Sequence, residues 1–210
     1  MDAFSCAACP RRCGALRKPA QPSGGFCGMP AGFVVARAAL HQWEEPCISG
    51  QHGSGTVFFS GCSLRCVYCQ NQQISLGRYG ALVTEENLLR MFDRLIEQGA
   101  HNLNLVNPTH YAPMLAKALK KYCSPVPVIY NSGGYERVEM LKALEGLVDI
   151  YLPDLKYVDS AVSLRYSGAA DYFDYASKAI LEMSRQVGKA TFDENGAVSY
   201  THLTLPTKLE

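Results

Sequence analysis

Three closely spaced cysteines constrain this chain more than any other feature. The segment 61–71 contains Cys62, Cys66 and Cys69, and it follows directly on the apolar run 56–60. A strand that ends in a cysteine loop presents its thiols at its carboxyl end, where α/β folds build their sites. Structural metal sites usually close with four protein ligands, whereas a site that does chemistry keeps one position open. Three thiols therefore predict an open metal centre at the end of a strand.

The composition and charge of the chain argue against two classes of partner, nucleic acids and membranes. With 210 residues, 48% hydrophobic and 19% charged, the chain can bury a sizeable core, and disorder is not expected. Its formal net charge is +1 and it has no long Lys/Arg run, so we expect no nucleic-acid partner. It also lacks a recognisable signal peptide or long uncharged span, which predicts no membrane partner and a cytoplasmic location.

A second group of cysteines precedes the first. Cys6, Cys9 and Cys13 have the spacing C-x2-C-x3-C, and Cys27 follows after a Pro/Gly-rich connector. Four such thiolates can converge on one zinc ion or one iron-sulfur cluster, and the sequence does not distinguish these metals. Two disulfides are the alternative, which is disfavoured in a cytosolic chain. Few apolar residues occur in this region, so metal binding would supply its folding free energy.

Five other residues have simpler interpretations. Cys47 and Cys123 stand apart from both groups, and we expect both of them to be small buried hydrophobic side chains. His41, Glu44 and Glu45 could serve as ligands or acid/base groups, but a solvated strand edge is the favoured interpretation.

Strand and helix patterns alternate from residue 56 onward. Apolar runs predict strands at 56–60, 102–107, 126–131 and 148–152, and helical spacing predicts helices at 84–98, 111–122, 137–144 and 172–186. The first helix has a Thr84 cap and ends at Gly99. This alternation predicts an α/β fold with a parallel sheet and right-handed crossovers.

Polar residues follow three of these strands. They are Asn107-Pro-Thr109-His110, Asn131-Ser132-Gly-Gly and Pro-Asp154-Leu-Lys156. Separately they are explained by turn chemistry or a surface ion pair. Together they should open on the same rim as the cysteine loop, which predicts a ligand pocket there.

These motifs resemble those of a known family. The pattern Cys62-x3-Cys66-x2-Cys69, with Tyr68, resembles the CxxxCxxC signature of the radical S-adenosylmethionine (SAM) superfamily. Segments 41–50, 107–110, 130–135 and 149–157 and the N-terminal Cys-x2-Cys-Pro-Arg-x-Cys pattern resemble proteins described as similar to pyruvate formate-lyase activating enzyme. The resemblance implies a partial (β/α) barrel of radical SAM type at residues 33–197, with a small Cys-rich metal-binding extension at residues 1–32.

The resemblance also implies a chemistry. Cys62, Cys66 and Cys69 would hold a 4Fe-4S cluster whose fourth iron chelates S-adenosylmethionine. One electron, from a donor such as flavodoxin or ferredoxin, would cleave this cofactor to methionine and a 5'-deoxyadenosyl radical that abstracts hydrogen. For an activase, the hydrogen donor is a glycyl-radical protein.

Cofactor-binding positions follow from the same resemblance. Asn107, Thr109 and His110 would bind the methionine part of the cofactor, in place of the commoner Gly-Gly-Glu. Tyr68 would pack near the adenine, or serve as a core aromatic. The residues expected to contact ribose, carboxylate or substrate are Asn131, Ser132, Asp154 and Lys156.

The C-terminal segment 198–210 is unusual. Its sequence Val198-Ser-Tyr-Thr-His-Leu-Thr-Leu-Pro-Thr207 resembles a translated transposon-end adapter from sequencing-library preparation, so we expect a non-native tail without a site. Superfamily cores resemble six strand-helix units, and only four are counted here. We therefore expect a truncated barrel with an unpaired edge, lower stability than its parent and a risk of inactivity.

Two other functions are also compatible with the residues described above. A non-catalytic iron-sulfur electron-transfer protein would explain both cysteine groups without a substrate pocket. A zinc-binding interaction module would explain the N-terminal group but not the polar strand ends.

Overall fold

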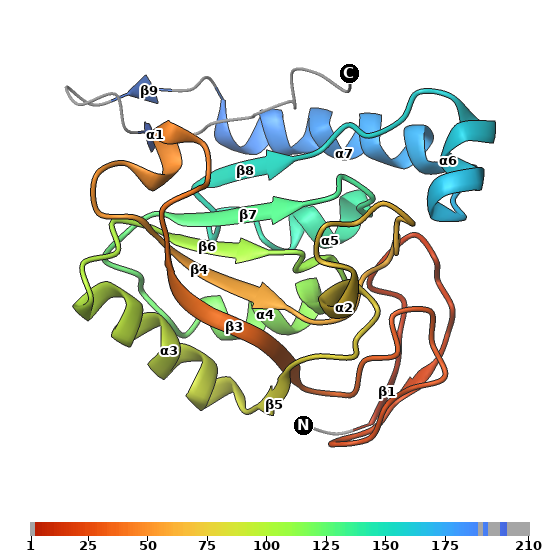
Figure 1. Ribbon diagram of the computed structural model, residues 1–210, viewed down its shortest axis with the longest axis horizontal. Helices are drawn as coiled ribbons and strands as arrows, with labels where there is room; N and C mark the ends of the chain where they lie inside the picture. Colours follow the sequence, from red (N-terminus) through yellow and green to blue (C-terminus); the bar gives the residue numbers. More distant parts are fainter. Residues whose placement is uncertain (1–2, 189–190, 193–197, 201–210) are drawn as a thin grey trace.

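A six-stranded mixed sheet forms the centre of the molecule (Figure 1). The structure is a computed structural model that describes residues 3–188, 191–192 and 198–200. In sheet order the strands are β5 (Ala81–Val83), β3 (Phe33–His41), β4 (Ser54–Phe59), β6 (Leu103–Val106), β7 (Val128–Ser132) and β8 (Ile150–Pro153).

The four predicted strands are confirmed, and they are parallel. β4 pairs with β6, β6 with β7, and β7 with β8, all in parallel register. Their carboxyl ends therefore meet at one edge of the sheet. The two strands at the edge next to β4, β3 and β5, differ from the expected parallel pattern, because β3 runs antiparallel to β4 and β5 antiparallel to β3. Within the described residues the sheet stays open beyond β8, so closure into a barrel is not seen.

The helices follow the strands in sequence. The predicted ones are α3 (Glu85–Glu97), α4 (Ala112–Leu119), α5 (Val138–Lys142) and α7 (Tyr172–Val187). A 3-10 turn, η1 (Thr109–Tyr111), precedes α4, and the sequence did not predict α1 (Pro46–Ser49), α2 (Gln72–Ser75) or α6 (Ser160–Ser167).

Helix α3 shows how local sequence fixes an element. The Thr84 hydroxyl accepts a hydrogen bond from the Asn87 amide, which caps the first turn. Leu88, Phe92 and Leu95 lie on one face at helical spacing and are fully buried or nearly so. They join the main core between the helices and one face of the sheet.

The opposite face of the sheet has a smaller apolar cluster. Ile48 of α1 packs there against Ile129 of β7 and against Ile150 and Leu152 of β8. Helix α1 therefore covers part of this face, and the polar side chains of the site lie farther along the strands.

Two small antiparallel pairs lie outside the main sheet. In the N-terminal extension, β1 (Phe4–Ser5) pairs with β2 (Leu16–Arg17). Near the other end of the chain, β9 (Thr191–Phe192) pairs with β10 (Val198–Tyr200). The adapter-like segment 198–210 thus begins in β10, and its residues 201–210 lie outside the described residues.

In the part of the chain that the structure describes, no helix is both long and apolar enough to cross a bilayer.

Candidate functional site

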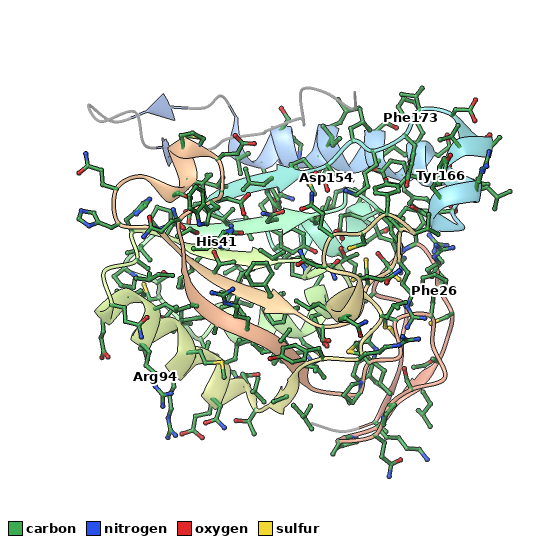
Figure 2. All side chains as sticks on the ribbon, viewed as in Figure 1. Phe26, His41, Arg94, Asp154, Tyr166 and Phe173 are labelled. Carbon is green, nitrogen blue, oxygen red and sulfur yellow. The ribbon has the colours of Figure 1, made fainter. Side chains whose placement is uncertain are left out.

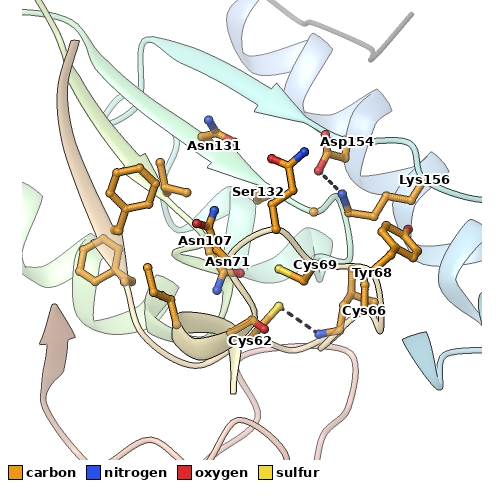
Figure 3. A pocket seen from close by; sticks show the side chains of 18 residues that line it. Cys62, Cys66, Tyr68, Cys69, Asn71, Asn107, Asn131, Ser132, Asp154 and Lys156 are labelled. Carbon is orange, nitrogen blue, oxygen red and sulfur yellow. Dashed lines mark hydrogen bonds and ion pairs between the residues drawn. The ribbon is translucent and has the colours of Figure 1, made fainter. Parts of the chain in front are cut away.

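A cavity of about 510 Å3 opens at the carboxyl ends of the parallel strands (Figure 3). The cysteine loop forms one side of it, and the loops after β6, β7 and β8 form the other. The predicted site residues that line it are Cys62, Cys66, Tyr68, Cys69, Asn107, Asn131, Ser132, Asp154 and Lys156. Figure 2 shows Asp154 toward this end of the sheet, with Phe26 and Tyr166, whereas His41 lies toward the other end.

Two of the three thiols of the cysteine loop accept hydrogen bonds. Cys62 Sγ accepts a 3.3 Å hydrogen bond from the Leu64 amide, and Cys66 Sγ accepts a 2.9 Å hydrogen bond from the Ser167 hydroxyl. Burial raises the pKa of Cys62, and the nearby thiols of Cys66 and Cys69 add to the rise.

No three Cys, His, Asp or Glu side chains stand in a metal-binding arrangement within the described residues. The donor chemistry nevertheless fits an iron-sulfur cluster with one open iron. Three thiols of one loop line a single cavity, and a fourth is absent from its lining.

Asn107 connects the end of β6 to the start of the cysteine loop. Its amide Nδ2 donates to the Gly61 carbonyl. Asn107 has a φ of 59°, in the left-handed region that asparagine tolerates better than most residues. This turn places the side chain at the cavity wall.

An ion pair between Asp154 and Lys156 lies on the far wall of the cavity. Burial lowers the pKa of Lys156, but the Asp154 carboxylate and the thiols of Cys66 and Cys62 outweigh this effect, and the net pKa is raised. The lysine therefore remains a cation at the cavity wall.

Thr109 and His110 do not line the cavity, contrary to the expectation that they contact the cofactor. The chain turns into η1 after Asn107, which buries both side chains. The Thr109 hydroxyl donates to Glu136 at 2.5 Å. His110 Nε2 lies 2.8 Å from the Ser60 carbonyl, and complete burial lowers the pKa of His110 to about 3. A neutral ring whose Nε2 donates to Ser60 satisfies this geometry.

Glu136 is a buried carboxyl that the sequence did not single out. It is fully buried and accepts hydrogen bonds from Thr109 and, at 3.2 Å, from the Tyr130 hydroxyl. Burial raises the pKa of Glu136 to about 7. Its contacts join β7 to the loop after β6, behind the cavity wall.

Glu44 is a second residue that the sequence placed differently. It is half-buried, not part of a solvated edge, and its Oε2 accepts from Asn104 Nδ2 at 3.0 Å and from Asn131 Nδ2 at 3.2 Å. Burial raises the pKa of Glu44, although the hydrogen bond from Asn104 opposes the rise. His41 is the last residue of β3, and segment 42–45 is a loop that enters α1, not an extended edge. A polar Asn104 inside an otherwise apolar strand was the signal available in the sequence.

The N-terminal cysteines lie in a compact region beside the cysteine loop. Cys6, Cys9 and Cys27 are buried and Cys13 is exposed. Burial raises the pKa of Cys9 to about 12, and the nearby thiols of Cys27 and Cys6 add to this. The buried guanidinium of Arg17 donates to Cys27 Sγ at 3.3 Å.

All nine cysteines of the chain lie within the described residues and are free thiols. The disulfide alternative for the N-terminal group is therefore not seen. Cys47 is half-buried, but Cys123 is exposed just beyond α4. The expectation of a buried Cys123 was wrong.

Tyr68 lies at the mouth of the cavity. The residue is 48% exposed, and its hydroxyl lies 2.5 Å from that of Tyr157. Tyr68 therefore lines the cavity and also contacts Tyr157 through its hydroxyl.

Comparison with known proteins agrees with this geometry. The sequence profile of the Radical SAM superfamily matches residues 56–207, a range that includes most of β4, the cysteine loop and the whole of β6, β7 and β8. The chain is also similar to an uncharacterized protein of Methanocaldococcus jannaschii, with 28% identity over 214 residues. That match covers 98% of this chain but only 58% of the relative, so the chain spans little more than half of the relative's length.

Proposed function

The chain belongs to the radical SAM superfamily, and on that premise we propose that its cavity binds S-adenosylmethionine beside a 4Fe-4S cluster held by Cys62, Cys66 and Cys69. One observation carries the proposal: the three thiols and the polar ends of three parallel strands line the same cavity. The cluster, when bound, supplies the electron that reductively cleaves the cofactor to a 5'-deoxyadenosyl radical.

The polar side chains of the cavity match the polar groups of this cofactor. The Lys156 ammonium can pair with its carboxylate, and the Asp154 carboxylate can accept from the ribose hydroxyls. The amides of Asn107 and Asn131 and the hydroxyl of Ser132 offer further donors and acceptors.

The apolar side chains of the cavity suit the rest of the ligand. The Tyr68 ring offers a face for the adenine. Phe58, Leu64 and Val106 line the cavity as well and exclude water from it.

Anaerobic reconstitution tests this function. The protein is loaded with iron and sulfide, reduced with dithionite and given S-adenosylmethionine, and 5'-deoxyadenosine and methionine are measured by mass spectrometry. We expect both products from the wild type and from Cys123→Ala, whose cysteine is exposed and outside the cavity lining. We expect neither from Cys66→Ala, and full activity of that variant would contradict the ligand assignment.

The same experiment separates the alternatives. A reduced cluster without cofactor cleavage would indicate an electron-transfer protein. Bound zinc with no iron would indicate a zinc-binding interaction module.

We further propose that the hydrogen donor is a glycyl-radical protein and that a flavodoxin or ferredoxin supplies the electron. The sequence resemblance to activating enzymes supports this, as does the exposure of Val67 and Tyr68 beside the cavity, where a partner loop could approach. A candidate partner deuterated at its glycine α-carbons tests it. Label should appear in 5'-deoxyadenosine, and a candidate that transfers no label is eliminated.

A second metal centre at Cys6, Cys9, Cys13 and Cys27 in the extension, residues 1–32, is also proposed, with residues 33–197 as the core. Three buried thiols and the buried Arg17 cation beside Cys27 support it, because a metal-thiolate centre is an anion that such a cation stabilises. Metal analysis of the wild type and of Cys9→Ala tests it. An unchanged metal content in the variant would contradict this centre.

A further inference from the structure

Three hydroxyl groups form a continuous hydrogen-bonded chain behind the cysteine loop. The hydroxyls of Tyr68 and Tyr157 are 2.5 Å apart, and the Tyr157 hydroxyl lies 2.7 Å from Ser167 Oγ. The Ser167 hydroxyl donates to Cys66 Sγ at 2.9 Å. The chain starts at an exposed ring in the cavity and ends on a buried thiol.

The direction of donation follows from counting hydrogens. Each hydroxyl has one hydrogen and can accept with its lone pairs. Because Ser167 gives its hydrogen to Cys66, it can only accept from Tyr157. Tyr157 has then used its own hydrogen, so it accepts from Tyr68. All three hydrogen bonds therefore point toward the sulfur, and each polarises the next one.

Ser167 is held in place from several sides. It is the last residue of α6, 101 residues away from Cys66 in the sequence. Arg11 Nη2 donates to the Ser167 main-chain carbonyl at 2.7 Å, and the Val67 amide donates to the Tyr166 carbonyl at 2.9 Å. These bonds fix the end of α6 against the cysteine loop, so contact between the serine and the thiol does not depend on a single hydrogen bond.

We propose that this chain tunes the reduction potential of the cluster that Cys66 holds, with Ser167 as the positioning residue that acts on the sulfur. The inference rests on the proposed function, because it requires a cluster at Cys66. A hydrogen bond to a ligating sulfur withdraws electron density and favours the reduced, more negative cluster, which raises the potential. Tyr157 and Tyr68 strengthen the bond that Ser167 donates.

Potentiometric titration followed by electron paramagnetic resonance tests this directly. The signal of interest is assigned to this cluster by its loss in Cys66→Ala. Removal of the donor in Ser167→Ala should shift the midpoint to a more negative potential. The expected shift is up to about tenfold in the equilibrium constant for one-electron reduction, or about 59 mV.

The matched control is Ser163→Ala. Ser163 is a buried serine of the same helix, but its hydroxyl donates to the Ser160 carbonyl at 3.1 Å. Its replacement should leave the potential unchanged. Tyr157→Phe keeps Ser167 and removes only its donor, so we expect a smaller shift of the same sign.

Two results would overturn the inference. One is a Ser167→Ala protein with a full cluster and the wild-type potential. If Ser167→Ala assembles no cluster, Tyr157→Phe carries the test, and a wild-type potential in that variant is the second. A wild-type protein that forms no 4Fe-4S cluster at all would instead overturn the proposed function. A normal cluster that does not cleave the cofactor would leave the potential measurement valid.

Discussion

Arg11 Nε donates a 2.8 Å hydrogen bond to the main-chain carbonyl of Ser63 and so joins the Cys-rich extension directly to the cysteine loop. The same guanidinium donates to the carbonyls of Ser167 and Gly168 at the end of α6. It also lies over the Phe26 ring, 4.0 Å from its centroid. One planar side chain thus connects three segments that are distant in the sequence.

Replacement of Arg11 should loosen this connection. An ammonium cannot reproduce the fork of donors, so Arg11→Lys should lose about two hydrogen bonds and roughly 2 kcal/mol of unfolding free energy. For a chain of this size that lowers Tm by about 4–8 °C, measured by thermal unfolding of the loaded protein. The exposed neighbour provides the control, because Arg12→Lys should unfold like the wild type. Equal Tm values for both variants would exclude a bridging role for Arg11.

Glu44 should affect cofactor binding without binding the cofactor itself. Its carboxylate holds the Asn131 amide, which lines the cavity. In Glu44→Ala this amide loses its anchor, so we expect KM for S-adenosylmethionine to rise about tenfold, the effect of about 1.4 kcal/mol in binding free energy. Iron content should stay unchanged. Glu44→Gln keeps an acceptor and should recover part of the loss.

The control for this prediction is the exposed adjacent residue. Glu45→Ala changes the same charge without touching Asn131 and should leave KM at the wild-type value. If both alanine variants raise KM equally, the cause is the net charge of the loop and not the contact with Asn131.

Features encoded by neighbouring residues were predictable from the sequence. Thr84 and the helical spacing that follows it define α3 to within one residue of the expected start and end. Cys62, Cys66 and Cys69 are likewise close in sequence, so their spacing alone indicates a shared site. Helix α6 lacks such a signal, because Val162 and Leu164 are exposed and give it no apolar stripe toward the core.

Contacts between distant residues could not be predicted in this way. Glu44 is separated from Asn104 by 60 residues and from Asn131 by 87 residues, so no local pattern links them. The reverse problem affects Thr109 and His110. They come only two and three residues after Asn107, but the η1 turn rotates them away from the cavity into the core. Their proximity to Asn107 in the sequence therefore led to the wrong expectation for the environment of their side chains.

The buried carboxyl of Glu136 should make stability depend on pH. Burial raises its folded-state pKa to about 7, above the ordinary value of 4.5. The folded protein therefore holds a proton that the unfolded chain releases, and stability falls as pH rises from about 4.5 to about 7. Glu136→Gln keeps one acceptor oxygen, for the hydroxyl of Thr109 or of Tyr130, and removes the titration. Relative to wild type it should gain roughly 2–3 kcal/mol between pH 5 and pH 8.

Denaturant unfolding at both pH values measures this difference. The result that would contradict it is a parallel pH dependence in the two proteins, because the Glu136 carboxyl would then titrate alike in the folded and unfolded states.

Gly134 should be irreplaceable at the junction of the loops after β7 and β8. A Cβ at this position would lie 2.3 Å from the Asp154 carbonyl oxygen, and its φ is 74°. The backbone of the site would have to shift, so Gly134→Ala should cost about 3 kcal/mol or more of unfolding free energy and disturb the cofactor cavity.

Gly146 separates the effect of backbone strain from the effect of the steric clash. It also has a φ of 74°, but no heavy atom lies within 4 Å of the added carbon. Gly146→Ala should therefore cost only the backbone term, about 1–2 kcal/mol, with normal cofactor cleavage. Equal losses in the two variants, measured by denaturant unfolding, would show that φ alone requires the glycine at position 134.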